Sequence, residues 1–175
     1  MHGPPASYTG DLYQPTHWGQ TVQVLDTVVP TLGRRNRRRW RVLRTEALAK
    51  WAPAGFTFVV VSGDPANYPK FPVDEPDEYL RLTAPLISGV LRIMDLQGLQ
   101  AWDLYGGALY ANGGAWAALD MSRFWTLGAD TRRYAMVHEL GHCFGLAHRQ
   151  NVEGTCMWRG LEPDAHDLDS LRNYY

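Results

Sequence analysis

The order of apolar and polar positions predicts a strand, a helix and a second strand in the first third of the chain. Residues 22–29 are rich in valine and predict a strand that ends at Pro30. The next segment places apolar residues three or four positions apart, the spacing of one helix face, at Trp40, Leu43, Ala47 and Trp51. It predicts a helix over 37–51, and the aromatic and β-branched residues of 56–61 predict a second strand. A strand, a helix and a strand in this order favour a βαβ unit with parallel strands.

The rest of the chain predicts a long surface loop, a third strand, a hairpin and two helices. We expect the loop at 64–79, the strand at 89–96, the hairpin strands at 108–111 and 115–119, and the helices from the cap Asp130 and from residues 163–164 onwards. The pair Asn112-Gly113 favours the positive φ angles of a tight hairpin turn. The pattern therefore predicts an α/β (α+β) fold, with a twisted and mostly parallel sheet, one antiparallel edge strand and a C-terminal helix.

Length and composition are those of one globular domain. The 175 residues are 45% hydrophobic and 20% charged. Residues 1–18 show no periodicity and form a predicted tail, a candidate pro-segment, before a single domain at 19–175. No basic segment followed by an apolar one opens the chain, so we expect no signal peptide and a cytoplasmic protein by default, with export by another route left open. The net charge of −1 predicts no bulk attraction to nucleic acid or membrane, and we expect a monomer.

Positive charge is concentrated in one segment. Seven arginines fall between Arg34 and Arg44, in the first predicted helix and just before it. Such a run is either a patch for an anionic partner or the solvated face of a helix. Only Trp40 is aromatic within it, so the run lacks the interleaved aromatic side chains of a nucleic-acid stacking platform.

Candidate metal ligands and a candidate general base occur together in the segment HELGHCFGLAH. Residues four apart lie one above the other on a helix face, so His138 and His142 aim their imidazoles at one point. Glu139 is one step round the helix from His138, so it can lie beside a metal bound by the two histidines without binding it. Gly145 can take a left-handed conformation and end the helix, which lets the chain turn back and bring His148 in as a third ligand. Three protein ligands leave the fourth position of a tetrahedral zinc for water, as in catalytic sites.

This spacing resembles the signature of the metzincin metallopeptidases, H-E-x-x-H-x-x-G-x-x-H followed by a Met-turn. Met157 follows in Gly-Thr-Cys-Met and is the candidate Met-turn residue, which in the family forms a hydrophobic floor under the zinc ligands. Within the clan, the chain is most similar to matrixins over 133–142, in the closing helix at 167–174, and weakly over 113–120. The resemblance implies a metzincin-like fold with an active-site helix and one catalytic zinc. Calcium is a further candidate cofactor.

The chain also departs from the matrixin pattern. Arg149 stands where matrixins usually have serine. No histidine lies between His17 and His138, so we do not expect the structural zinc of animal matrixins, and the tail has no cysteine for their latency switch. Some metzincins place a tyrosine two residues after the methionine to help bind the oxyanion. Arg159 occupies that position and either takes that part or is a solvated surface residue.

Two further features leave alternatives open. Cys143 and Cys156 form a disulfide between the active helix and the Met-turn, or they are two buried thiols. The tail segment 8–12 is similar to the F-x-G-D motif of astacin pro-segments, in which the aspartate occupies the open position of the zinc. Asp11 is therefore a candidate latency switch, and the alternative is an ordinary Gly-Asp turn.

Together the residues and the resemblance predict a zinc-dependent endopeptidase. Glu139 is the expected general base, which takes a proton from the attacking water and passes it to the leaving amine. We expect a protein or peptide substrate to lie extended along 109–112, beside a pocket walled by 157–163 in which Trp158 and Leu161 favour apolar side chains. Two alternatives remain, a cell-wall (peptidoglycan) endopeptidase and a non-catalytic, zinc-stabilised Arg-rich binding module.

Overall fold

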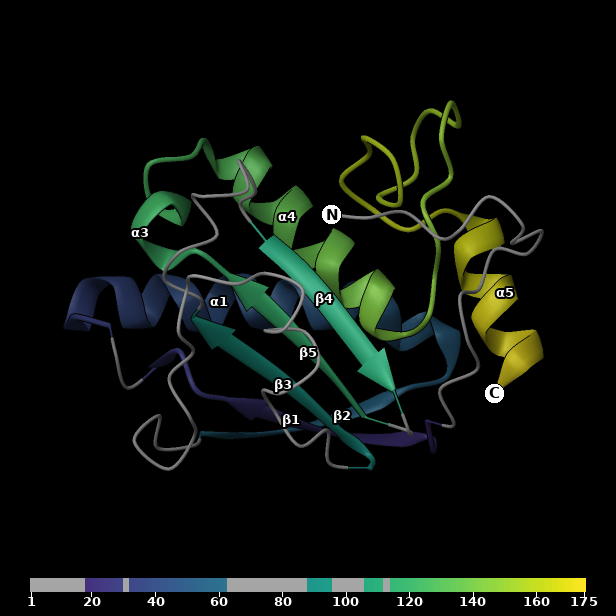
Figure 1. The fold of residues 1–175 in the computed structure, drawn as a ribbon, viewed down its shortest axis with the longest axis horizontal. Helices are drawn as coiled ribbons and strands as arrows, with labels where there is room; N and C mark the ends of the chain where they lie inside the picture. The colour runs from purple at the N-terminus through teal and green to yellow at the C-terminus, as the bar shows by residue number, and fades with distance from the viewer. Residues whose placement is uncertain (1–17, 30–31, 63–87, 96–105, 112–113) are drawn as a thin grey trace.

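A five-stranded mixed sheet organises the computed structural model, which describes residues 18–29, 32–62, 88–95, 106–111 and 114–175 (Figure 1). The strands are β1 (Thr21–Asp26), β2 (Thr57–Ser62), β3 (Val90–Asp95), β4 (Gly106–Ala111) and β5 (Gly114–Leu119), in the order β2-β1-β3-β5-β4. All neighbouring pairs are parallel except β4 and β5, so β4 is an antiparallel edge strand. The predicted fold class is confirmed.

Helices lie behind this sheet and at its two ends. They are α1 (Arg34–Trp51), α3 (Met121–Phe124), α4 (Ala129–Cys143) and α5 (Ala165–Tyr174), and a 3₁₀ turn, η2 (Ala52–Ala54), follows α1. In Figure 1, α1 and α4 lie side by side behind the strands, and α5 lies beyond the end of β4. β1, α1 and β2 form the expected βαβ unit, in which the two strands pair in parallel. In the described part of the chain, no helix is both long enough and apolar enough to cross a membrane.

The end of β1 is tied to α1 by a buried carboxylate. Asp26 is fully buried, and it accepts hydrogen bonds from the backbone N–H groups of Val28 and Val29 at 2.9 and 3.2 Å. Its second oxygen accepts from Trp40 Nε1 at 2.9 Å and pairs with Arg44. A buried charge is tolerated where such partners satisfy it. Arg44 is therefore a structural residue, unlike the exposed arginines that precede it in α1.

Some predicted boundaries were wrong, for local reasons. The first strand ends at Asp26 and not at Val29, because the N–H groups of Val28 and Val29 donate to the Asp26 carboxylate and not to a neighbouring strand. Helix α1 starts at Arg34, three residues before the expected start, and α4 is capped by Gly128, so Asp130 lies in its first turn. Helix α3 was not predicted, and Asp120 caps it through Ser122 N and Arg123 N. The expected loop at 64–79 lies outside the described residues. The turn residues Asn112-Gly113 do as well, although the strands on either side of this turn are described.

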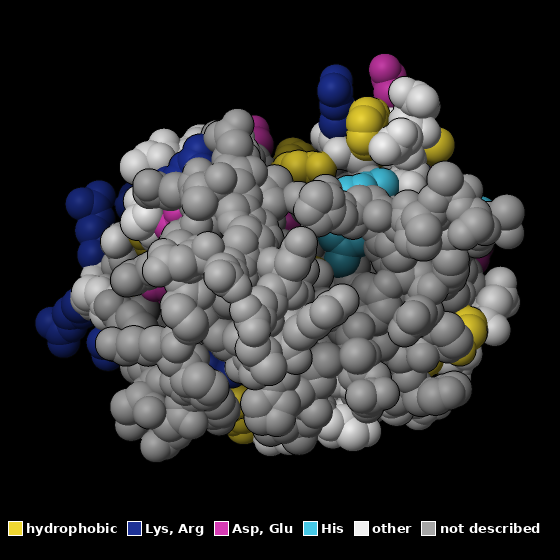
Figure 2. All heavy atoms as spheres, in the orientation of Figure 1, with side chains coloured by type: hydrophobic (Ala, Val, Ile, Leu, Met, Phe, Trp, Pro, Cys, Tyr) yellow, Lys and Arg dark blue, Asp and Glu magenta, His cyan; other side chains and the backbone are white. Residues whose placement is uncertain are grey.

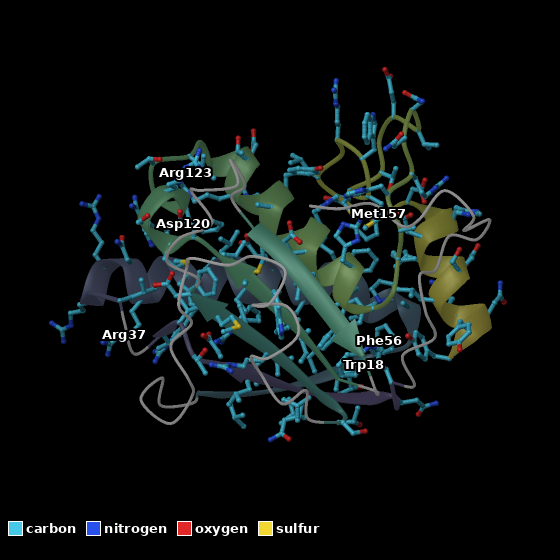
Figure 3. All side chains as sticks on the ribbon, in the orientation of Figure 1. Trp18, Arg37, Phe56, Asp120, Arg123 and Met157 are labelled. Carbon is cyan, nitrogen blue, oxygen red and sulfur yellow. The ribbon has the colours of Figure 1, made fainter. Side chains whose placement is uncertain are left out.

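An aromatic cluster supports the C-terminal end of α4. The Phe144 ring stacks on Phe56 with centroids 4.8 Å apart and contacts Trp51 at 5.7 Å and Trp18 at 6.2 Å. Trp18, the last residue of the predicted tail, is buried in this core and donates from Nε1 to the carbonyl of Cys143 at 3.1 Å (Figure 3). This packing holds the end of α4, and with it the segment that follows, in one position.

Candidate metal centre

Three histidines meet at the end of α4. The Nε2 atoms of His138, His142 and His148 form a triangle with sides of 3.1, 3.1 and 3.0 Å. His138 and His142 are buried and His148 is half-buried. In the space-filling view, histidine side chains are visible in a hollow beside the C-terminal segment (Figure 2). The structure thus brings together the three side chains that the sequence predicts as zinc ligands, and such a group could hold a metal ion.

The helix end explains how His148 reaches the other two. Gly145 has φ 94°, a left-handed conformation that suits glycine. Its N–H donates to the carbonyl of His142 at 2.9 Å, and the N–H of Leu146 donates to the carbonyl of Gly141 at 3.0 Å. These two bonds are the Schellman pattern that ends a helix and reverses the chain. The sequence prediction for Gly145 is confirmed in its conformation.

Hydrogen bonds to carbonyl groups orient two of the imidazoles. His138 Nδ1 lies 2.7 Å from the carbonyl oxygen of Cys156, and His142 Nδ1 lies 2.7 Å from that of Leu146. Because a carbonyl oxygen only accepts, each Nδ1 carries the hydrogen and each Nε2 keeps a lone pair. Partners of this kind orient the ligating histidines of metal sites.

The facing lone pairs favour a shared cation. Burial lowers the pKa of His138 to about 4 and lowers the pKa values of His142 and His148 as well, so protonation near neutral pH does not relieve their repulsion. The corners of the nitrogen triangle lie about 1.8 Å from its centre. An ion at the usual Zn–N distance of about 2.0–2.1 Å therefore touches all three nitrogens at once. The residues present fit zinc.

Glu139 lies next to this group and is also buried. Its exposed fraction is 3%, and among the described residues its Oε2 has no hydrogen-bond partner. Burial raises the pKa of Glu139 to about 8. Its side chain passes beside the start of the edge strand, since a Cβ on Gly106 would come within 3.0 Å of Glu139 Cγ. The free carboxylate oxygen therefore belongs to a side chain wedged between α4 and β4.

Met157 packs against α4 at Gly141, and its position there requires a glycine. Met157 is fully buried, and a Cβ added to Gly141 would collide with Met157 Sδ and approach Trp51 at 2.9 Å. Trp51 is held there by its own hydrogen bond, from Nε1 to the carbonyl of Val137 at 3.2 Å. Because Gly141 has no side chain, Trp51 and Met157 can both pack closely against α4 at this position, between His138 and His142 in the sequence.

Replacing Gly141 with alanine should destabilise the protein. In a helix interior this change ordinarily stabilises by up to about 1 kcal/mol, but the crowding here should cost roughly 1–3 kcal/mol instead. Urea unfolding measures the effect. Gly107→Ala is the matched control, because nothing lies within 4 Å of a Cβ at Gly107. A Gly141→Ala protein as stable as the wild type would show that the three elements are not closely packed.

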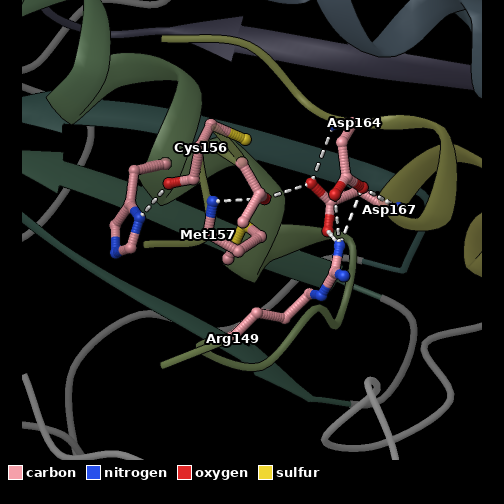
Figure 4. Close-up of polar contacts among 7 residues, drawn as sticks. Arg149, Cys156, Met157, Asp164 and Asp167 are labelled. Atoms are coloured by element: carbon pink, nitrogen blue, oxygen red, sulfur yellow. Dashed lines mark hydrogen bonds and ion pairs between the residues drawn. The ribbon is translucent and has the colours of Figure 1, made fainter. Parts of the chain in front are cut away.

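A polar network joins the segment around Met157 to α5 (Figure 4). The hydroxyl of Thr155 accepts from the N–H of Met157 at 3.0 Å and donates to the buried carboxylate of Asp167. Asp167 and Asp164 also form the capping box of α5. The network therefore fixes the backbone around Cys156, whose carbonyl orients His138.

Arg149 completes the network from the other side. Its Nη1 lies 2.7 Å from both carboxylate oxygens of Asp164 and 3.1 Å from Asp167 Oδ1. The backbone N–H of Arg149 donates to the carbonyl of Met157 at 3.2 Å. The residue that departs from the matrixin pattern thus links the segment after His148 to the backbone at Met157 and to the start of α5. Sequence reasoning missed this role, because only the fold brings two aspartates of the last helix to that position.

Tyr134 is a second residue near the site whose role sequence reasoning missed. Its hydroxyl donates to the carbonyl of Trp158 at 2.5 Å, and its ring lies 5.1 Å from that of His138. The available signal was its position four residues before His138, on the same helix face. Burial raises the pKa of Tyr134 to about 12, so it remains a donor near neutral pH.

The remaining candidates are placed as follows. Cys143 and Cys156 are both buried as free thiols, the second of the two alternatives left open, and burial raises the pKa values of both. Arg159 is exposed and lies over the Trp158 ring at 5.2 Å. Asp11 lies outside the described residues, and its latency role stays a prediction. Among the described residues there is no second group of three or more metal-ligating side chains, so calcium gains no support.

Comparison with known proteins assigns neither a family nor a function to this chain. No protein-family model matches the sequence, and no curated protein matches it. Similar solved structures include archaemetzincin from Archaeoglobus fulgidus complexed with malonate, at 18% identity and a TM-score of 0.46, covering 86% of this chain and 99% of that chain. Another is the GM1-bound form of the ECX AB5 holotoxin, at 15% identity and a TM-score of 0.44, covering 89% of this chain and 71% of that chain. The function proposed below therefore rests on the site itself.

Proposed function

We propose that this protein is a zinc-dependent endopeptidase. One observation carries the proposal: three imidazole nitrogens lie 3.0–3.1 Å from one another, beside a buried glutamate whose Oε2 has no partner among the described residues. Structural zinc sites usually have four protein ligands, whereas three ligands and a nearby carboxylate are typical of hydrolytic sites. Imidazole also binds other divalent metals. Zinc is favoured here because three protein ligands and one open position suit its tetrahedral coordination.

The chain's own residues divide the work of hydrolysis. His138, His142 and His148 would hold the ion. A bound zinc supplies Lewis-acid chemistry, since it lowers the pKa of water towards about 7 and polarises a peptide carbonyl. Glu139 accepts the proton of the attacking water and delivers it to the leaving nitrogen. The Glu139 side chain is buried beside the histidines, and among the described residues its Oε2 has no hydrogen-bond partner, so this oxygen is free to receive the proton.

The edge strand offers a place for an extended peptide. β4 ends the sheet, so one row of its N–H and C=O groups has no neighbouring strand in the described sheet. Peptides bind such edges by adding a strand. Because the Glu139 side chain passes beside Gly106 at the start of β4, a peptide along β4 would lead towards the catalytic carboxylate. Residues 109–111 of the predicted substrate edge belong to β4, and Asn112 lies outside the described residues.

The metzincin type, with matrixins as the most similar group, is the finer part of the proposal. It is supported by the signature spacing, the left-handed Gly145 that returns His148, and the buried Met157 packed against Gly141. The half-buried Trp158 and the exposed Leu161 follow the Met-turn and provide apolar surface for a substrate side chain. We also propose a monomer that acts on protein or peptide.

The experiment compares casein and purified peptidoglycan as substrates for the zinc-loaded protein. We expect cleavage of quenched fluorescent casein, loss of activity with a chelator, and recovery when zinc is restored. Hydrolysis of peptidoglycan alone would favour the cell-wall alternative. A protein that binds one zinc and cleaves neither would favour the non-catalytic module.

A further inference from the structure

A groove between α1 and α4 lies apart from the metal centre. It has a volume of about 290 Å³, and its lining includes Arg38, Arg39, Val42, Trp125, Arg132 and Arg133. None of its lining residues belongs to the candidate metal site. In Figure 2 the Lys and Arg side chains gather at the end of the molecule where α1 begins, the end at which Figure 3 labels Arg37.

The arginines of α1 that line this groove lower the stability of the helix. The first turn of α1 contains no acidic residue, and its N-cap makes no side-chain hydrogen bond. Arg38 and Arg39 each follow another arginine by four positions, so like charges repel one another along this helix face. Arg38 and Arg39 are exposed and have no ion-pair partner among the described residues. A local arrangement that costs stability without an internal partner points to an external one.

The opposite wall of the groove is partly neutralised. Arg133 pairs with Asp130 at 3.1 Å and lies 3.9 Å from Glu46, a carboxylate of α1 that also lines the groove. Arg132 lies over the Trp125 ring at 5.7 Å and donates to the carbonyl of Leu127. Of the arginines that line the groove, Arg38 and Arg39 have no carboxylate, carbonyl or ring contact among the described residues.

The floor of the groove is apolar. Val42 follows Arg38 and Arg39 along the same helix and is 51% exposed, and the half-buried Leu43 and Trp125 lie with it in the lining. An apolar floor beside unpaired arginines complements a carboxylate next to an apolar side chain. Single-stranded nucleic acid would instead require a row of exposed aromatic faces. The volume is close to the lower limit of small-ligand pockets and suits one or two side chains.

We propose that this groove binds an acidic peptide segment, with carboxylates on Arg38 and Arg39 and an apolar side chain against Val42 and Trp125. The partner is a protein or peptide that carries glutamate or aspartate beside leucine-like residues. Binding at the groove requires neither zinc nor Glu139, so the proposal stands or falls independently of the peptidase function.

The test measures fluorescence anisotropy of a rhodamine-labelled octapeptide, Glu-Glu-Leu-Glu-Glu-Leu-Glu-Glu, with the full-length protein at low salt. The Arg38→Glu/Arg39→Glu variant should bind at least tenfold more weakly than the wild type. The matched control, Arg34→Glu/Arg35→Glu, makes the same charge change on the same helix outside the groove and should bind within threefold of the wild type. A peptide with serine in place of leucine should bind at least threefold more weakly.

Three outcomes would overturn the proposal. These are an absence of binding by the wild type, equal weakening by both double variants, and tighter binding of a single-stranded DNA 12-mer than of the peptide. Both double variants should fold, because exposed glutamates near a helix N-terminus are favourable, and thermal unfolding checks this. If the Arg38→Glu/Arg39→Glu protein unfolds early, Arg38→Gln/Arg39→Gln must still lower the affinity by more than Arg34→Gln/Arg35→Gln.

Discussion

Replacing Glu139 with glutamine should lower peptidase activity by at least about 100-fold, the contribution of a general base, and leave one zinc bound per chain. Glutamine keeps the shape of the side chain beside Gly106 but cannot accept the proton of water. Because Glu139 is not among the grouped nitrogen ligands, the metal should stay in place. The measurements are kcat/KM on a quenched peptide and zinc content of the same preparation.

A matched control makes the same chemical change nearby. Glu153 is exposed, and Glu153→Gln should cleave the peptide at the wild-type rate. Near wild-type activity of Glu139→Gln would exclude Glu139 as the base. Loss of zinc together with activity would instead show that Glu139 holds the metal.

The same variant tests the burial of Glu139 without any substrate. In the metal-free protein the pKa of Glu139 is raised to about 8, above its ordinary value of 4.5. Between these values the unfolded chain has lost the proton that the folded chain keeps, so this group contributes stability that is lost as pH rises towards 8. The wild type should therefore lose stability relative to Glu139→Gln as the pH rises from about 4.5 to 8. Urea unfolding across that range measures the difference, and a constant difference would contradict the buried position.

Removing any one of the three histidines should abolish stoichiometric zinc binding. The wild type should bind one zinc per chain, and His138→Ala, His142→Ala or His148→Ala should lower the zinc affinity by more than the roughly 10–100-fold that an orienting partner contributes. Peptidase activity should disappear with the metal. Competition with a chromogenic chelator measures the affinity after the protein has been stripped and refilled.

His166→Ala serves as the control for this series. His166 is exposed on α5, outside the grouped imidazoles, so its replacement should leave the zinc content at one per chain. Zinc that survives the loss of two of His138, His142 and His148 would place the metal elsewhere.

The sequence alone determined the parts of the site that depend on local geometry. Helical spacing places His138 and His142 on one face wherever the helix lies. Gly145 marks a helix end that reverses the chain, because its left-handed conformation is open mainly to glycine. Runs rich in valine and aromatic residues likewise predict β1 and β2, and a strand-helix-strand order implies that they are parallel.

Only the tertiary structure decided the surroundings of those local elements. Gly141 is required by Met157 and Trp51, which come from distant parts of the chain, and no local pattern shows that they meet there. Arg44 pairs inside the core with Asp26, whereas Arg38 and Arg39 stay exposed, although all three belong to one run of arginines. Arg149 reads as a departure in sequence but in the fold connects the third histidine's segment to Asp164 and Asp167. Backbone spacing determines which side chains share a helix face. Burial and charge pairing depend on which faces pack together, and that information lies in contacts between residues far apart along the chain.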